Sequence, residues 1–382
     1  MSCIFCGAAG LWEFPQFAEM PRVTSDCRPF PGGGRLFLCR HCSLVQKVPD
    51  QRWMDEIASI YASYEMYRQA DGAEQSVLDP ATNRFELRSN LIVRYLESRL
   101  GLPAGTSVLD VGCGTGVTLE ALARVPNAQR LFGLEFDERN LARLSRIRGF
   151  DRLFRGALAA IPRRFDLVTL VHALEHFPRP AQALQDAAGK LEEGGALFVQ
   201  VVDSPRNPFD LVIADHMGHF SASTLRTVAQ DQGLEVSIVD ANLVRRELAM
   251  IARNRPAGAA APVAVVVPDD FEFAARNLRW LQAVLRESAE AASRYPHFGL
   301  FGSSIAATWL ADALGDRVEF FVDEDPARIG HHHLDRPIYA PRDVPSGAGT
   351  YVGMAPLSAS AVMRRFAGSA LNLVAPPVLA TL

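Results

Sequence analysis

Apolar runs alternate with amphipathic stretches over the middle of the chain, which predicts strands alternating with helices. The predicted strands are 107–112, 130–136, 151–156, 165–174, 195–203, 234–242 and 248–254. The predicted helices between them are 118–125, 138–147, 180–191 and 223–233. Several of these strands are apolar almost throughout, as in a parallel sheet that is covered on both faces. We therefore expect a doubly wound α/β unit here.

Other patterns flank this unit. Residues 1–50 show little periodicity, whereas residues 51–100 look helical, and the run 84–100 places its apolar side chains on one face. After a linker at 256–262, an amphipathic helix at about 271–294 leads into a second alternation of strands and helices. The predicted parts are a small module at 1–50, a helical segment or lid at 51–100, the α/β domain at 101–255, and a second Rossmann-like domain at 256–382.

A glycine-rich turn follows the first predicted strand. In VLDVGCGTGVTLEAL, the pattern Asp-x-Gly-x-Gly-x-Gly is formed by Asp110, Gly112, Gly114 and Gly116. Glycine lets the backbone approach a ligand closely, and the N–H groups at a helix start favour a polar or anionic group. Glu135 ends the next strand, where an acid can accept both hydroxyls of a ribose. The spacing differs from the dinucleotide fingerprint.

Four of the six cysteines form two Cys-x2-Cys pairs, Cys3 with Cys6 and Cys39 with Cys42. In a cytosolic protein such pairs bind metal more often than they form disulfides. Four thiolates fill a tetrahedral Zn²⁺ site, so the ion would be structural, without an open position for catalysis. Residues 1–50 have too few apolar side chains for a core, which favours such a staple. Free or oxidised thiols in a disordered tail are the alternative.

Composition restricts the partners. The 382 residues are 48% hydrophobic and 21% charged, with a net charge of −4, so bulk electrostatics attract neither nucleic acid nor an anionic membrane. Residues 1–50 carry five basic and four acidic side chains, without the basic footprint of an RNA-binding ribbon. No apolar run could span a bilayer and no signal peptide is apparent, so we expect a cytoplasmic protein.

Two histidines follow the strand that ends at Asp203, in the segment ADHMGHFSASTL, residues 214–225. Open α/β sheets bind substrates on this side. Imidazole titrates near neutral pH, so His216 or His219 could be a general base, with Asp215 adjacent. The same residues could instead be purely structural.

Four further features have roles that can be stated only in general terms from the sequence. Ser221 or Ser223 could cap the helix that follows. Glu175 and His176 are expected to be structural or to line a cofactor. The Ser303–Ser304 turn could hold a phosphate or be a simple tight turn. His331–His333 are expected to lie in a solvated loop because adjacent side chains point in different directions.

The glycine turn resembles motif I of class I S-adenosylmethionine (SAM) methyltransferases. The segment FDLVTLVHALEHFPRP, residues 165–180, is similar to their fourth strand and the turn after it. The resemblance implies that His172 faces the cofactor and that Gly156 and Ala157 meet its adenine. A cofactor-free relative of this fold is the alternative.

The order of zinc module, SAM domain and second Rossmann-like domain resembles the sugar C-methyltransferases of deoxysugar biosynthesis. FGSSIAATWL (301–310) and FVDEDPARIGHHHLDRPIYAP (321–341) match that family's C-terminal domain. Its motif Tyr-His-Glu-His-x-x-Tyr-Phe-Ser reads IADHMGHFS here, at 213–221. The resemblance assigns the base role to His216, with Asp215 in place of the glutamate. Ile213, Ala214 and His219 depart from the motif.

The resemblance implies methylation of a nucleotide-linked keto sugar. His216 would remove a proton from the acceptor, and Asp215 or His219 would orient the His216 ring. The departures leave O- or N-methylation of another sugar or small metabolite open. An RNA methyltransferase and a non-catalytic SAM-binding protein are further alternatives, and the charge balance speaks against the first.

Overall fold

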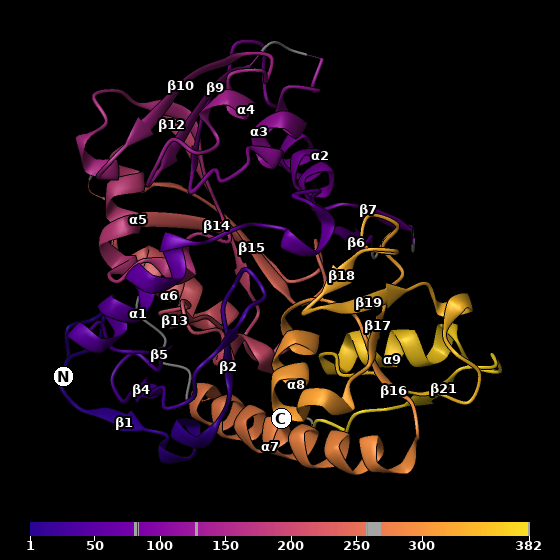
Figure 1. Ribbon diagram of the computed structural model, residues 1–382. Coiled ribbons are helices and arrows are strands. Elements are labelled where there is room, and N and C mark those ends of the chain that lie inside the picture. The colour runs from indigo at the N-terminus through magenta and orange to yellow at the C-terminus, as the bar shows by residue number, and fades with distance from the viewer. Residues whose placement is uncertain (80–81, 83, 127–128, 257, 259–268, 381–382) are drawn as a thin grey trace.

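The computed structural model describes residues 1–79, 82, 84–126, 129–256, 258 and 269–380. Figure 1 shows a large sheet at the top, the N-terminal part in indigo at the lower left and the C-terminal part in orange and yellow at the lower right. Of the predicted linker at 256–262, residues 257 and 259–262 lie outside the described residues. No helix in the described ranges is both long and apolar enough to cross a bilayer.

The central sheet has seven strands in the order β10-β9-β8-β11-β12-β15-β14. They are β8 (Ser107–Val111), β9 (Arg130–Glu135), β10 (Phe150–Arg155), β11 (Phe165–Val171), β12 (Leu191–Val202), β14 (Leu234–Asp240) and β15 (Glu247–Asn254). The first five are parallel, and β15 is antiparallel to both neighbours. The strand order reverses between β8 and β11, where open α/β sheets bind ligands.

Helices cover both faces of this sheet, which confirms the predicted doubly wound α/β fold. One face packs against α2 (Arg88–Leu100), α3 (Val117–Leu122) and α4 (Leu141–Leu144), and the other against α5 (Pro180–Ala188) and α6 (Ala222–Asp231). Ser221 caps α6 in a reciprocal capping box with Thr224, and Gly101 ends α2 with a φ of +76°. The helix predicted at 138–147 is only one turn, α4.

A second sheet has the order β18-β19-β17-β16-β20-β21. Its strands are β16 (Phe298–Phe301), β17 (Phe320–Val322), β18 (His332–His333), β19 (Arg336–Tyr339), β20 (Gly349–Tyr351) and β21 (Asn372–Val374). Only β18 is antiparallel to its neighbour. With α7 (Asp269–Arg294), α8 (Ile305–Leu314) and α9 (Pro356–Arg365), it forms a Rossmann-like unit. The solvated loop expected at His331–His333 is partly wrong, because His333 is buried against the Thr308 hydroxyl at 2.7 Å.

The N-terminal part has short elements. They are β1 (Leu11–Glu13), β2 (Arg22–Val23), β3 (Pro29–Phe30), β4 (Phe37–Cys39), β5 (Val45–Gln46), α1 (Gln51–Ala62), β6 (Ser76–Leu78) and β7 (Phe85–Leu87). The wholly helical pattern predicted for 51–100 is wrong, because the β6–β7 hairpin separates α1 from α2. Asp325 accepts a hydrogen bond from the Ser76 amide at 3.1 Å, so a contact distant in sequence helps to fix this hairpin.

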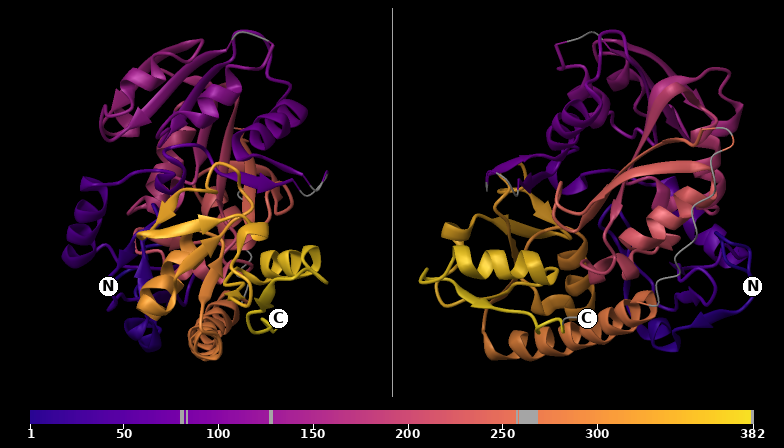
Figure 2. Two further views of the ribbon diagram at one scale, coloured as in Figure 1. Left: turned by 45° about the vertical axis from the view of Figure 1, so that its right-hand side comes forward. Right: turned by 180° about the vertical axis from the view of Figure 1, so that it is seen from behind.

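The N-terminal part shares its core with the C-terminal part. Phe17, Leu36 and Val45 belong to the same buried cluster as Phe273 of α7 and Trp309 of α8. The view from behind in Figure 2 shows the indigo segment beside one end of α7. Residues 1–50 were expected to lack a core of their own and to need a metal ion for stability. The shared cluster gives them a second source of stability, which is packing against the C-terminal part.

Candidate functional site

The glycine turn between β8 and α3 borders a cleft of about 880 Å³ at the carboxyl edge of the central sheet. Gly112, Gly114 and Gly116 have φ values of +72°, +52° and +82°. A Cβ on Gly112 would lie 3.1 Å from that of Ala173, and one on Gly116 would overlap Leu144. Backbone conformation and lack of space therefore both select glycine, and the turn can cradle a ligand.

Two acids flank this turn. Asp110 is buried and accepts a hydrogen bond of 2.6 Å from the Thr169 hydroxyl, yet burial raises its pKa to about 7. Glu135 ends β9 and accepts hydrogen bonds from the amides of Gly114 and Phe136, each at 2.9 Å. Glu135 therefore lies directly against the turn, where it could accept the hydroxyls of a ribose.

The other residues predicted to contact the cofactor line the same cleft. Gly156 and Ala157 follow β10, and His172 follows β11. Because the strand order is β10-β9-β8-β11, the structure brings these residues, Glu135 and the glycine turn together along one edge.

His172 lies between two carboxylates. Its Nδ1 is 3.4 Å from Glu175 Oε1, and its Nε2 is 3.1 Å from Glu247 Oε2. Burial acts to lower the pKa of His172, but the charge of Glu247 and the two carboxylate contacts raise it to about 9. The ring therefore carries a positive charge at neutral pH.

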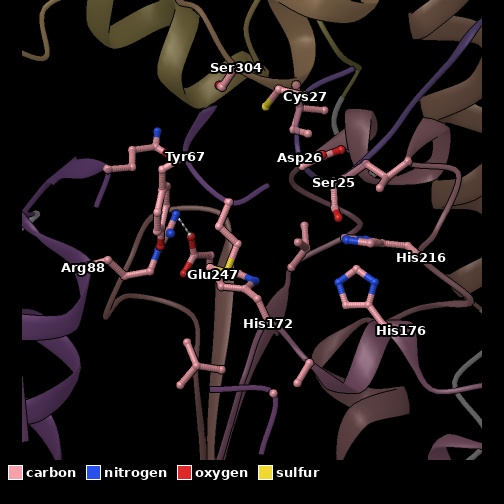
Figure 3. Close-up of a pocket in the computed structure, with 18 of the residues that line it drawn as sticks. Ser25, Asp26, Cys27, Tyr67, Arg88, His172, His176, His216, Glu247 and Ser304 are labelled. Carbon is pink, nitrogen blue, oxygen red and sulfur yellow. Dashed lines mark ion pairs between the residues drawn. The ribbon is translucent and has the colours of Figure 1, made fainter. Parts of the chain in front are cut away.

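His216 faces the cleft, and its partner is Asp210. In Figure 3, His216 lies beside His176 and Ser25. The Nδ1 of His216 is 2.7 Å from Asp210 Oδ1, and its ring meets the His176 ring edge to face at 4.8 Å. An aspartate on Nδ1 fixes the tautomer and leaves Nε2 as the basic atom. The arrangement suits proton abstraction.

The orienting role expected of Asp215 is wrong in the structure. Its buried carboxylate accepts a hydrogen bond from the Ser25 amide at 2.8 Å and lies 3.4 Å from Nδ1 of His176. Asp210 holds His216 instead, because the short helical turn Pro208–Val212 brings Asp210 back against it.

His219 lies beneath the cleft and is fully buried. Its Nδ1 is 2.8 Å from the second oxygen of Asp210, and its Nε2 is 3.4 Å from Nζ of Lys47. Burial lowers the pKa of His219 to about 4 and that of Lys47 to about 7. His219 thus contacts Asp210 and is not among the described residues that line the cleft.

The four predicted metal ligands converge. The sulfur atoms of Cys3, Cys6, Cys39 and Cys42 all lie within 4.8 Å of one another. The Cys3–Cys42 and Cys6–Cys39 pairs are 3.5 and 3.6 Å apart, close to the spacing of about 3.8 Å that four Zn–S bonds of 2.3 Å require. Amides of Phe5 and His41 donate to two of these sulfurs. The donor set fits a structural Zn²⁺ ion.

The cysteine module is joined to the histidine segment. Strand β13 (Gly218–His219) pairs with β5 and completes the sheet β1-β4-β5-β13. Lys47 of the module also donates to the carbonyl oxygen of His216 at 2.6 Å. The backbone around His216 is therefore held by the module that carries the cysteines.

The second Rossmann-like unit lines the opposite side of the cleft. Gly302, with a φ of +93°, and Ser304 follow β16, and Asp323 follows β17. Ser303 donates a hydrogen bond to Asp323 at 2.6 Å, and buried Arg328 lies 3.4 Å from the same carboxylate. The carboxyl edges of both sheets thus border one cavity (Figure 3).

Sequence reasoning missed Asp210, Ser25, Arg88 and Glu247. Asp210, six residues before His216, could have been considered as its partner, because a short helical turn between them can bring the two side chains into contact. No local pattern links Arg88 to Glu247, whose side chains meet at 3.0 Å, because they are far apart in the chain.

Comparisons with known proteins agree with this geometry. Residues 82–237 match the family described as a methyltransferase domain. A ubiquinone biosynthesis O-methyltransferase of Leptothrix cholodnii is 32% identical over 133 residues, 32% of this chain and 55% of that protein. One from Pseudomonas fluorescens is 33% identical over 126 residues, 31% and 52% of the two chains. The chain thus spans about half the length of these curated relatives.

Two solved structures of methyltransferases are among those to which part of the chain is similar. A glycopeptide N-methyltransferase with bound SAM has 14% identity and a TM-score of 0.37 over 44% of this chain and 94% of that chain. A SAM-dependent methyltransferase from Clostridium acetobutylicum has 11% identity and a TM-score of 0.36 over 53% and 99%. The family match and the doubly wound sheet together indicate a methyltransferase domain within residues 82–237.

Proposed function

We propose that the whole protein is a SAM-dependent methyltransferase of a small molecule and that His216 is its general base. The observation that carries the proposal is the 2.7 Å contact between His216 and Asp210 in the cleft that also contains the glycine turn. A base of this kind contributes only where cofactor and acceptor meet, and the proposal is supported because His216, Glu135 and Gly112 line the same cleft.

The residues around the turn fit SAM. Glu135 would hold the ribose, the backbone of Gly112–Gly116 would face the cofactor closely, and Gly156 and Ala157 would border the adenine. When bound, SAM supplies an electrophilic methyl group on a positively charged sulfur. The four cysteines would hold a structural Zn²⁺ ion, remote from the chemistry.

The protein's own chemistry is proton removal and positioning. Nε2 of His216 would take a proton from an acceptor carbon next to a carbonyl group, or from a hydroxyl, which leaves an electron pair ready for the methyl group. Asp210 stabilises the imidazolium that forms, and the proton then leaves to solvent. Fixing the acceptor beside the cofactor supplies much of the rate.

We propose a nucleotide-linked keto sugar as the acceptor. Support comes from the motif resemblance and from the second Rossmann-like edge, where the turn at Gly302–Ser304 borders the cleft. Backbone amides at such a turn could bind a phosphate of the nucleotide. The C-terminal unit would then hold the nucleotide while the sugar reaches His216.

O-methylation is the second candidate. The curated relatives are named ubiquinone biosynthesis O-methyltransferases, and their similarity extends over 133 and 126 residues, about a third of this chain. The same His216–Asp210 pair would deprotonate a hydroxyl, so the geometry of the base serves either reaction.

The two candidates differ in the atom that loses a proton. The protein would be incubated with SAM and a panel of nucleotide-linked keto sugars in heavy water, and the products analysed by mass spectrometry. Methyl gain with deuterium exchange at the neighbouring carbon, both lost in His216→Ala, would establish C-methylation. Methyl gain without exchange would favour O-methylation. Absence of product across this panel would contradict the keto-sugar acceptor, and absence of product in a second panel of phenols as well would contradict the proposed methyl transfer.

A further inference from the structure

A cluster of charged side chains at the base of the cleft has no part in the proton transfer described above. Arg88 at the start of α2 lies 3.0 Å from Glu247 at the start of β15, and His172 lies 3.1 Å from the other oxygen of Glu247. Arg246 immediately precedes Glu247 in the chain, and all four side chains line the cleft (Figure 3 labels Arg88, His172 and Glu247).

Each cationic side chain of this cluster has a nitrogen without a hydrogen-bond partner among the described residues. The Nε atoms of Arg88 and Arg246 are buried and lack a hydrogen-bond acceptor among the described residues. The Nε2 atom of His172 is close to Glu247 but is not aligned for a hydrogen bond. A buried N–H without an acceptor costs about 1–3 kcal/mol, so three in one cavity indicate a ligand that accepts them.

Backbone strain accompanies these donors. His172 and Arg246 have φ values of +48° and +69°, in the left-handed region that side chains with a Cβ rarely adopt. Such strain is concentrated at binding sites, where surrounding structure holds it. The amide of His172 donates to the carbonyl oxygen of Gln200 at 2.8 Å, and the carbonyl oxygen of Arg246 accepts from Asp203 at 2.9 Å. These hydrogen bonds hold the backbone of both residues, whose side chains line the cleft.

The charges in the cluster do not cancel. Arg88, His172, Arg246 and the neighbouring Arg245 lie near three carboxylates, those of Glu74, Glu175 and Glu247, which leaves one positive charge in excess. A guanidinium matches the two oxygens of a carboxylate in a planar, bidentate pair. A group with a single negative charge and two acceptor oxygens suits the site best.

We propose that Arg88, His172 and Arg246 form a binding subsite for a carboxylate group. The group has two potential sources, the α-carboxylate at the amino-acid end of SAM and an acid group on the acceptor. His172 directly follows β11, which lies two strands from β9 and its Glu135, a separation of about 10 Å across the sheet. A SAM molecule with its ribose at Glu135 would extend toward this subsite. The SAM source rests on the proposed function.

Calorimetric binding distinguishes the sources. S-adenosylhomocysteine carries the amino-acid end, whereas 5′-methylthioadenosine has the same nucleoside and sulfur without it. We expect Arg246→Met and His172→Asn to weaken S-adenosylhomocysteine about 10- to 100-fold and leave methylthioadenosine unchanged if SAM is the source. Asparagine tolerates the positive φ of residue 172, so this variant removes the charge and not the backbone conformation.

If the acceptor is the source, both nucleosides bind the variants normally. Benzoate or succinate then binds the wild-type protein saturated with S-adenosylhomocysteine, and binding is lost in the same variants. Arg253→Met, on the exposed part of β15, is the matched control and should change none of these affinities. Circular dichroism and melting curves would verify that all three variants are folded.

Unchanged nucleoside affinity together with unchanged carboxylate binding in both cleft variants would overturn the subsite. A wild-type protein that binds neither nucleoside would instead contradict the proposed function. The benzoate and succinate titrations on ligand-free protein would still test the subsite, because its donors belong to the chain itself.

Discussion

The carboxylate of Asp210 holds the ring of His216, with 2.7 Å between Oδ1 and Nδ1. The other oxygen, Oδ2, accepts from His219 at 2.8 Å, and Ser204 also contacts it. Burial acts to raise the pKa of Asp210, but the two histidines lower it far below its usual value. Asp210 therefore stays ionised and could both orient His216, the proposed base, and stabilise the cation that proton transfer would form.

The substitution Asp210→Asn should slow turnover by about 10²- to 10⁴-fold, because an amide can stabilise the wrong tautomer of His216 and carries no charge. Initial rates with the acceptor found in the sugar panel measure the effect. S-adenosylhomocysteine affinity should stay close to that of the wild type, since Asp210 lies outside the glycine turn. Wild-type turnover in the variant would refute the role of Asp210.

The turn at Gly112 gives a prediction for cofactor binding. Gly112→Ala should weaken S-adenosylhomocysteine at least 10-fold in calorimetry, because the new methyl group would crowd Ala173 and a positive φ of +72° disfavours alanine. Gly105→Ala is the matched control, because its φ is +78° with open space around it. Equal losses of affinity in the two variants would mean that strain alone, and not the cradle, is responsible.

The cysteine module gives a prediction for metal removal. We expect about one Zn²⁺ per chain by elemental analysis, and a chelator or Cys39→Ser should remove it and lower the melting temperature. Turnover should fall in parallel, because β5 of the module pairs with β13 next to His216. Cys27→Ser, which changes a cysteine outside the cluster, should keep the metal. Full activity in a metal-free, folded protein would argue against this coupling.

The ion pairs of His172 give a prediction for pH. The pKa of His172 is about 9 in the folded protein, above its ordinary 6.5, so its stabilising contribution is complete below pH 6.5 and is lost as the pH rises through 9. The free energy of unfolding should fall by on the order of 2–3 kcal/mol across this window, in urea titrations. Glu247 acts in a different pH range. Its pKa is lowered to about 2, so the stability contributed by its ionised form is lost only at acid pH, below the window from pH 6.5 to pH 9.

The matched variant for this test is His172→Asn, which does not titrate. Its stability should change less between pH 6.5 and pH 9 than that of the wild type. Parallel curves for the two proteins would show that His172 is not charged as the structure implies.

Local signals in the sequence were enough for several features. The glycine turn, Glu135 at the end of β9 and the two Cys-x2-Cys pairs could be identified because backbone conformation and ligand spacing are properties of a few neighbouring residues. The alternation of apolar strands with helices likewise predicted the doubly wound sheet, since each element repeats its pattern within its own length.

Nearness in the sequence gave the wrong partner for His216, because the chain turns back in this segment. Asp215 is adjacent to His216 but contacts His176, whereas Asp210 reaches His216 through a turn of short helix. The hairpin between α1 and α2 was predicted as helix because its strands are short and one contact that helps to fix them, from Asp325, is distant in the chain.

By itself, the sequence determined the strands of the central sheet, the glycine turn and the residue types that can bind metal or take a proton. Only the tertiary structure decided which of those residues meet. It paired Asp210 with His216, brought Arg88 to Glu247, joined the cysteine module to β13 and placed the edges of two sheets around one cleft. The physical reason is that conformation is set by neighbours in the chain, whereas contacts depend on how separately formed elements bury their apolar faces together.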